Sequence, residues 1–135
     1  MNFKTAMKTV LWDKAFDFKG RASRSEFWWF CAGLFGIAFV TAIAEMAIWG
    51  INAYPMGGPL IIALQLLTII QSISVTSRRI QDRGHSGWWQ LLYLTIIGTF
   101  VIVYWTLMPA KEKNNKWGIN PLEAELKETK KNLPK

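Results

Sequence analysis

The strongest constraint on the fold of this sequence is a set of three long runs that contain no charged residue. The runs cover residues 27–44, 46–77 and 84–110. A water-soluble domain of this length has no core large enough to bury all three, whereas a helix of about 20 apolar residues crosses the hydrocarbon core of a bilayer. We therefore expect an integral membrane protein.

The runs predict an all-α membrane protein with three transmembrane helices, over residues 27–49, 59–76 and 88–108. Residues 50–58 are rich in Gly, Pro and Asn and predict a turn between the first two spans. Tryptophans lie near the ends of the first and third spans, where indole rings favour the membrane–water interface. These predicted interface anchors are Trp28, Trp29, Trp49, Trp88, Trp89 and Trp105.

The 135 residues suffice for one domain, which we place at residues 1–122. Residues 1–19 alternate apolar positions with lysines and predict an amphipathic helix in the membrane interface; a plain solvent-exposed helix is the alternative. The polar tail at residues 123–135 is expected to be disordered or weakly helical. The apolar stripe of the N-terminal helix consists of Phe3, Met7, Val10, Leu11 and Phe18.

A helix cap is predicted at the start of the first span. Ser23 and Glu26 form a Ser-x-x-Glu capping box directly before the apolar run. The Ser23 hydroxyl is expected to accept a hydrogen bond from the Glu26 amide, and the Glu26 carboxylate to accept one from the Ser23 amide. Arg21 and Arg24 are expected to reach lipid phosphates from the same segment.

The distribution of positive charge predicts the orientation in the bacterial inner membrane. Six Lys and Arg residues precede the first span, three lie between the second and third, and residues 50–58 have none. Because Lys and Arg concentrate in cytoplasmic loops, the N-terminus is expected in the cytoplasm. A continuous third helix then places everything after it outside, although residues 109–135 contain seven lysines. A buried hairpin with its turn at Gly98 would remove this conflict, but each arm would reach only about 15 Å.

Several functional classes find no support in the sequence. With one cysteine (Cys31) and one histidine (His85), the chain forms neither an internal disulfide nor a Cys/His zinc site by itself. No phosphate-binding, dinucleotide-binding or nucleophile-elbow motif is present, and we expect no cofactor. The net charge is +7, but the basic residues flank apolar runs, which favours contact with anionic phospholipid headgroups over nucleic acid.

Charged residues before the first span and after the second form the main candidate site. Two interpretations are open: a basic collar that binds a lipid headgroup or an acidic partner segment, or a structural network in which Glu26 and Asp82 neutralise arginines. An ion pair between Asp82 and Arg78 or Arg79 would hold the loop between the second and third spans. The candidate residues are Arg21, Arg24, Glu26, Arg78, Arg79, Asp82 and Arg83.

Three further features of the sequence bear on chemistry. Asp82 and His85 are close enough in sequence for an acid–imidazole pair, although a salt bridge of Asp82 is favoured. Glu45 is the acidic residue inside a predicted span, near its far end, and a proton or ion role is the alternative to simple exposure at the interface. A polar stripe on the second span predicts helix packing, with a water-lined path as the alternative. The stripe contains Gln65, Thr68 and Ser72 or Gln71.

Three motifs in this order resemble the YhaH-like family of bacterial inner-membrane proteins, also called domain of unknown function 805. Residues 18–28 (FKGRASRSEFW) resemble F-x-G-R-x-x-R-x-E-[FY]-W, and residues 78–89 contain RRIQD and SGWW, similar to R-R-L-H-D and S-G-W-W. Residues 115–121 (NKWGINP) resemble N-x-[YF]-G-x-D-P. The chain departs from the family at Gln81, where His is usual, and at Asn120, where Asp is usual. The resemblance implies a small multi-pass inner-membrane protein.

We therefore expect a membrane interaction or accessory protein without enzymatic activity, which meets the lipid bilayer and a second copy or another membrane protein. Three spans are too few for a transporter with internal repeats, so the alternative is an oligomeric small-solute or ion pathway. A lipid-acting membrane enzyme is a third hypothesis, which rests on Asp82, His85 and the arginines.

Overall fold

The computed structural model describes residues 1–50 and 57–131 and is mainly helical over them. The predicted turn at residues 50–58 therefore lies largely outside the described residues. The elements in chain order are α1 (Phe3–Lys8), the π-helical η1 (Thr9–Asp13), α2 (Arg24–Trp49), α3 (Pro59–Asp82), the 3₁₀-helical η2 (Gly87–Leu94), α4 (Ile96–Leu107), β1 (Asn114–Asn115), β2 (Gly118–Ile119) and α5 (Pro121–Lys131).

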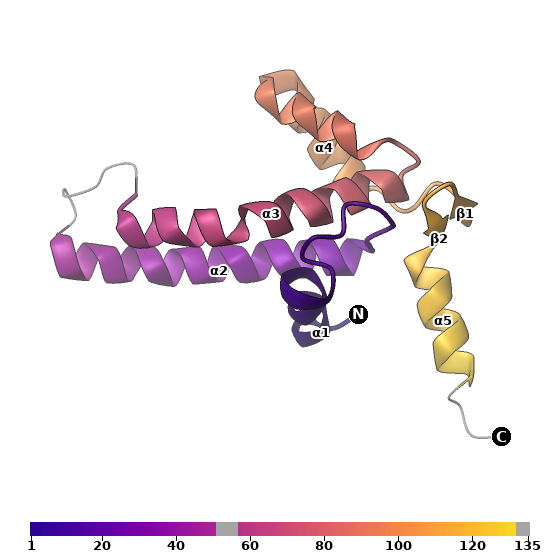
Figure 1. The fold of residues 1–135 in the computed structure, drawn as a ribbon, viewed down its shortest axis with the longest axis horizontal. Helices are drawn as coiled ribbons and strands as arrows, with labels where there is room; N and C mark the ends of the chain where they lie inside the picture. Colours follow the sequence, from indigo (N-terminus) through magenta and orange to yellow (C-terminus); the bar gives the residue numbers. More distant parts are fainter. Residues whose placement is uncertain (51–56, 132–135) are drawn as a thin grey trace.

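The long helices α2 and α3 lie side by side and antiparallel (Figure 1). In the described part of the chain, these two helices are long and apolar enough to cross a membrane. The first agrees closely with the predicted span. The second continues six residues beyond the predicted end at residue 76, so Arg78, Arg79 and Asp82 lie on a helix and not in a loop. The predicted end of the second span was therefore wrong. The polar residues after position 76 end the apolar run, but they do not end the helix.

The surface of this helical pair changes along its length. On α3, every residue from Ser74 to Asp82 is buried, whereas most apolar residues closer to Pro59 are exposed. Leu67 and Phe35, on α3 and α2, are each about three-quarters exposed. An apolar surface of this extent is typical of contact with lipid. We call the end of the pair that carries Ser23 and Asp82 the polar end.

The third apolar segment is not one continuous helix, so that prediction was wrong. Thr95 has an extended backbone between η2 and α4, with φ −120° and ψ 144°. Its hydroxyl oxygen accepts a hydrogen bond from Gly98 N at 3.1 Å and caps α4. The two arms have lengths of about 16 Å and about 18 Å, roughly half the thickness of a hydrocarbon core.

The two arms form a hairpin, and both of its ends lie at the polar end. Gly87 follows closely after α3, while the other end returns so that the Arg79 guanidinium donates to the carbonyls of Thr106 (3.1 Å) and Met108. Near the turn, a Cβ on Gly98 would lie 2.2 Å from the Leu92 carbonyl oxygen. Because Gly98 has no side chain, the Leu92 carbonyl can approach its backbone closely, and the chain can reverse there.

The N-terminal helix is shorter than predicted and packs on α2 (Figure 1). Phe3 contacts Trp29 edge to face, with ring centroids 5.7 Å apart, and Met7 lies against Gly33. Val10 is fully buried in the main hydrophobic cluster. Part of the predicted apolar stripe is therefore covered by protein.

After the hairpin, the chain forms a small antiparallel ribbon and a helix. Asn114 pairs with Ile119, and Asn115 with Gly118. The last helix, α5, includes most of the predicted tail, extends from the ribbon away from the helical pair and has no buried residue. An ion pair of 3.4 Å joins the Met1 ammonium to Glu125 and places α5 near the N-terminus.

Candidate functional site

Five of the predicted charged residues meet in one buried group at the polar end. They come from the segment before α2, from the first turn of α2 and from the last turns of α3. Each is at most 5% exposed. We call this group the arginine cluster; it consists of Arg21, Glu26, Arg78, Arg79 and Asp82.

Asp82 lies between two arginines. Its Oδ1 accepts from Arg21 Nε at 2.7 Å, and its Oδ2 accepts from the Arg79 guanidinium. Arg21 also donates to the carbonyls of Glu112 (2.9 Å) and Gly118 (3.1 Å), on either side of the ribbon turn. The Arg21–Asp82 pair therefore attaches the C-terminal segment to α3.

Glu26 has the other ion pair of the cluster. Its Oε1 accepts from Arg78 Nη1 at 2.5 Å, while its amide donates to Ser23 Oγ at 3.1 Å. The predicted Ser23 cap is therefore present, but the Glu26 carboxylate binds Arg78. This ion pair joins the start of α2 to the end of α3.

The cluster has three arginines and two carboxylates, so it has an excess positive charge. Arg78 Nε and Nη2 are buried without a hydrogen-bond partner among the described residues. The two other predicted arginines lie outside it. Arg24 is exposed, and Arg83 Nη1 donates to the Pro109 carbonyl at 2.6 Å. The expectation that Arg21 reaches lipid phosphates was wrong, because its guanidinium is used inside the protein.

The three motifs from the sequence converge on this cluster. Arg21 and Glu26 belong to the first, Asp82 to the second, and Gly118 to the third. A family model described as "Protein of unknown function (DUF805)" matches residues 15–119. The chain belongs to this family.

Two similar proteins are named inner membrane protein YhaH, from Escherichia coli strain K12 and from Escherichia coli O157:H7. Each is 29% identical over 105 residues, which cover 77% of this chain and 86% of the relative. No solved structure matches the chain. Together with the long apolar helices, the family identifies a membrane protein.

The positions at which the chain departs from the family pattern both have structural roles. Gln81 Nε2 donates to the Phe18 carbonyl at 2.9 Å, and the Gln81 carbonyl accepts from Asn115 Nδ2 at 2.9 Å. Asn120 Oδ1 accepts from Leu122 N at 3.0 Å at the start of α5. Gln81 therefore links the first and third motifs of the family.

The predicted ion pair of Asp82 with an arginine of its own helix is present, and Asp82 and His85 do not form the alternative acid–imidazole pair. Asp82 is bound by arginines, whereas the His85 ring stacks on Trp105 with centroids 4.1 Å apart. Burial lowers the pKa of His85 from its ordinary value, and the positive charges of Arg83 and Lys111 lower it further. No hydrogen bond joins Asp82 to His85 in the part of the chain that the structure describes.

The predicted interface anchors have different environments. Trp28 Nε1 donates to the Thr106 carbonyl at 3.3 Å, and Trp89 contacts Trp105 edge to face. Trp105 is half-buried, and the others expose much of their surface. Those exposed tryptophans are Trp28, Trp29, Trp49, Trp88 and Trp89.

Glu45 has a role that the sequence reasoning missed. Its carboxylate is 6% exposed and accepts hydrogen bonds from the amides of Gly58 (2.9 Å), Leu60 (2.5 Å) and Ile61 (3.1 Å). Gly58 has no side chain with which to cap α3, so Glu45 supplies the cap from α2. The sequence contains one signal for this role: the predicted second span begins at Gly58-Pro59, where no side chain is available to cap the helix.

The polar stripe on α3 is partly satisfied by its own helix. Thr68 Oγ1 donates to the Leu64 carbonyl and Ser72 Oγ to the Thr68 carbonyl, both at 2.8 Å. Gln65 and Thr68 line a groove of about 380 Å³ between α2 and α3. Over residues 1–50 and 57–131, no group of three His, Cys, Asp or Glu side chains is placed to hold a metal ion.

Proposed function

We propose that this protein is a non-enzymatic accessory protein of the inner membrane, with both termini in the cytoplasm. In this arrangement α2 and α3 cross the bilayer, while η2 and α4 enter it from the cytoplasmic side and return. Every described Lys and Arg belongs to residues 1–24, 78–83 or 111–131, and contacts connect each of these segments to the polar end. The positive-inside rule then favours a cytoplasmic polar end.

The observation that carries the accessory role is the exposure of α5. This helix has no buried residue, and Leu122 and Leu126, one turn apart, are 57% and 55% exposed. Glu123, Glu125 and Lys127 flank this apolar pair. An amphipathic helix with an apolar pair and charged flanks is suited to a groove on a partner protein. The arginine cluster, by contrast, uses its charges to hold segments of this chain together.

In-membrane photocrosslinking of the full chain tests this function. A photoreactive amino acid replaces Leu126 on α5 and, as the matched control, the lipid-facing Phe39 on α2. We expect Leu126 to give a discrete adduct with another membrane protein and Phe39 to react mainly with lipid. If both positions react with lipid alone, the accessory role is refuted.

The oligomeric small-solute or ion pathway predicts a different result. Its support is the groove with Gln65 and Thr68 between the two long helices. Phe39 would then give an adduct with twice the 15.5 kDa mass of the chain. The hydroxyl bonds of Thr68 and Ser72 within α3 make this function less favourable, because they leave these groups fewer bonds for a solute.

A further inference from the structure

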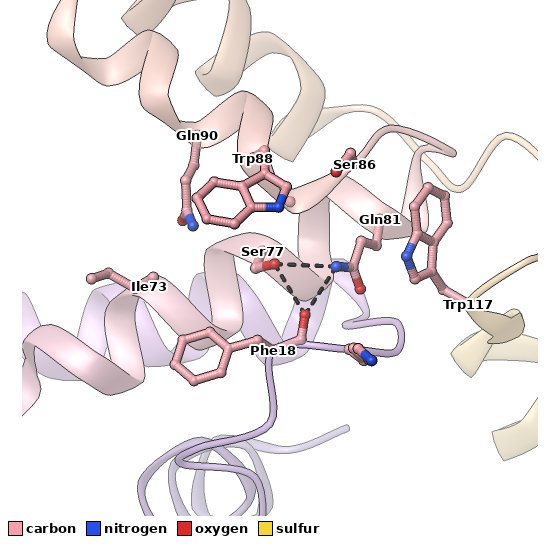
Figure 2. Close-up of a pocket in the computed structure, with 10 residues that line it drawn as sticks. Phe18, Ile73, Ser77, Gln81, Ser86, Trp88, Gln90 and Trp117 are labelled. Carbon is pink, nitrogen blue, oxygen red and sulfur yellow. Dashed lines mark hydrogen bonds between the residues drawn. The ribbon is translucent and has the colours of Figure 1, made fainter.

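A cavity of about 460 Å³ lies beside the arginine cluster, where α3 ends and η2 begins (Figure 2). Its walls come from four segments, the first three being Phe18 and Lys19 before α2, one face of α3 with Ile73, Ser77 and Gln81, and the start of η2 with Trp88. Trp117, in the C-terminal ribbon, closes one side. Its volume falls within the range of about 300–1,000 Å³ that is typical of sites for small ligands.

One wall of this cavity carries an acceptor without a partner. Gln81 is 5% exposed, and its Nε2 donates to the Phe18 carbonyl (2.9 Å) and to Ser77 Oγ (3.2 Å). The reverse orientation of the amide would place Oε1 against the Phe18 carbonyl, so the contacts determine the direction of the group (Figure 2). Gln81 Oε1 is left buried with no hydrogen bond to any described residue. Buried acceptors of this kind normally have a donor.

The other walls define what else a ligand must contain. Lys19 is the charged residue among the described residues that line the cavity, so it favours an anionic group. Ile73 and Trp88 line the cavity and are 40% and 78% exposed, which connects it to the lipid-facing surface. A fitting ligand therefore has an anion, a hydrogen-bond donor and an apolar part.

We propose that this cavity binds the headgroup of a glycerophospholipid that carries a hydrogen-bond donor beyond its phosphate. The phosphate lies at Lys19, the donor bonds to Gln81 Oε1, and the acyl chains run past Ile73 and Trp88 into the bilayer. Ethanolamine and glycerol headgroups both have such a donor, whereas a choline headgroup has none. The site uses different side chains from the arginine cluster and does not depend on the accessory role.

Native mass spectrometry of the full chain in detergent, with defined lipids added, tests the site. We expect phosphatidylethanolamine, phosphatidylglycerol or both to bind about tenfold more tightly than phosphatidylcholine, the difference expected for one hydrogen bond. Tighter binding of phosphatidylethanolamine, of phosphatidylglycerol or of both shows whether an ammonium or a hydroxyl group supplies the hydrogen-bond donor. Equal binding of all three lipids refutes the proposal.

Two variants separate the two contacts. Lys19→Ala should weaken all three lipids by about tenfold, because each has a phosphate, whereas the exposed Lys14→Ala should change none of them. Gln81→Leu should remove the preference over phosphatidylcholine and leave phosphatidylcholine itself unchanged. If Gln81→Leu fails to fold, the lipid ratio of the parent and the Lys19→Ala result decide. Identical binding by Lys19→Ala and the parent overturns the proposal.

Discussion

At the scale of single residues, Asp82 holds the two arginines that connect separate segments at the polar end. Its two carboxylate oxygens bind Arg21, from before α2, and Arg79, from its own helix. Arg21 in turn holds the carbonyls next to the ribbon, and Arg79 holds the end of α4. One carboxylate thus stabilises the junction of α3, the hairpin and the C-terminal segment.

Replacement of Asp82 is therefore predicted to destabilise the fold. Asp82→Asn leaves two buried arginines without their counter-ion, and breaking such a pair costs about 3–5 kcal/mol. Asp13→Asn, at an exposed position, is the matched control. The thermal midpoint in detergent, followed by tryptophan fluorescence, should fall for Asp82→Asn and stay constant for Asp13→Asn. A parent-like midpoint accompanied by loss of a cellular phenotype would instead indicate a chemical role for Asp82.

A second prediction at this scale concerns Glu45. Glu45→Ala removes the acceptor for three amides at the start of α3 and should cost about 0.5–2 kcal/mol, the range for loss of a helix cap. Glu45→Gln retains one acceptor oxygen and should cost less than Glu45→Ala. Glu128→Ala, on the exposed surface of α5, serves as control. Equal midpoints for all three variants would show that Glu45 does not cap α3.

At the scale of elements, the hairpin of η2 and α4 is the feature that hydropathy did not identify. An apolar run of this length satisfies the criterion for a transmembrane helix whether or not it reverses. The reversal depends on a capping hydroxyl at Thr95 and on a close backbone approach at Gly98. The second contact joins residues of different arms, so it becomes visible only when both are placed in space.

Gly98→Ala distinguishes the hairpin from a continuous helix. In the hairpin, the new Cβ would lie 2.2 Å from the Leu92 carbonyl oxygen, and overpacking of this kind costs about 1–3 kcal/mol. In a continuous helix, the same change would stabilise by up to about 1 kcal/mol, because alanine is the better helix former. Gly36→Ala, on α2 with open space around its Cβ, is the control. A raised thermal midpoint for Gly98→Ala would contradict the hairpin.

At the scale of the whole molecule, the hairpin changes the predicted topology. A continuous third helix would place the lysine-rich tail outside, against the charge rule. With both ends of the hairpin at the polar end, Arg21 donates to the Glu112 carbonyl and the Met1 ammonium pairs with Glu125, so the segment after the hairpin lies close to the N-terminus. The return of the hairpin to the polar end removes this conflict and supports the proposed topology, in which both termini lie in the cytoplasm.

Reporter fusions and cysteine labelling test this topology. We expect a C-terminal green fluorescent protein to be bright and a C-terminal alkaline phosphatase to be inactive. In a Cys31→Ser background, Asn52→Cys should react with an impermeant reagent in intact cells, and Lys127→Cys only after permeabilisation. Active alkaline phosphatase would show that the tail lies outside. Protection of Asn52→Cys in intact cells would show that the orientation is the reverse of the proposed one.

The sequence by itself determined the membrane class, the two long apolar helices, the Ser23 cap and the family. These properties depend on local quantities: hydropathy over one helix length, a four-residue capping pattern and ordered motifs. It also identified the charged residues of the arginine cluster, although not which residues pair, apart from the spacing of Arg79 and Asp82.

Only the tertiary structure decided the pairing of Glu26 with Arg78, the cap from Glu45, the hairpin and the return of the hairpin to the polar end. Each of these features depends on contacts between residues that are distant in the chain or that lie on the two arms of the hairpin. A carboxylate at position 45 has the same local sequence whether it faces water, binds a proton or caps α3. Its role follows from the three amides that the antiparallel packing of α2 and α3 brings within hydrogen-bond distance.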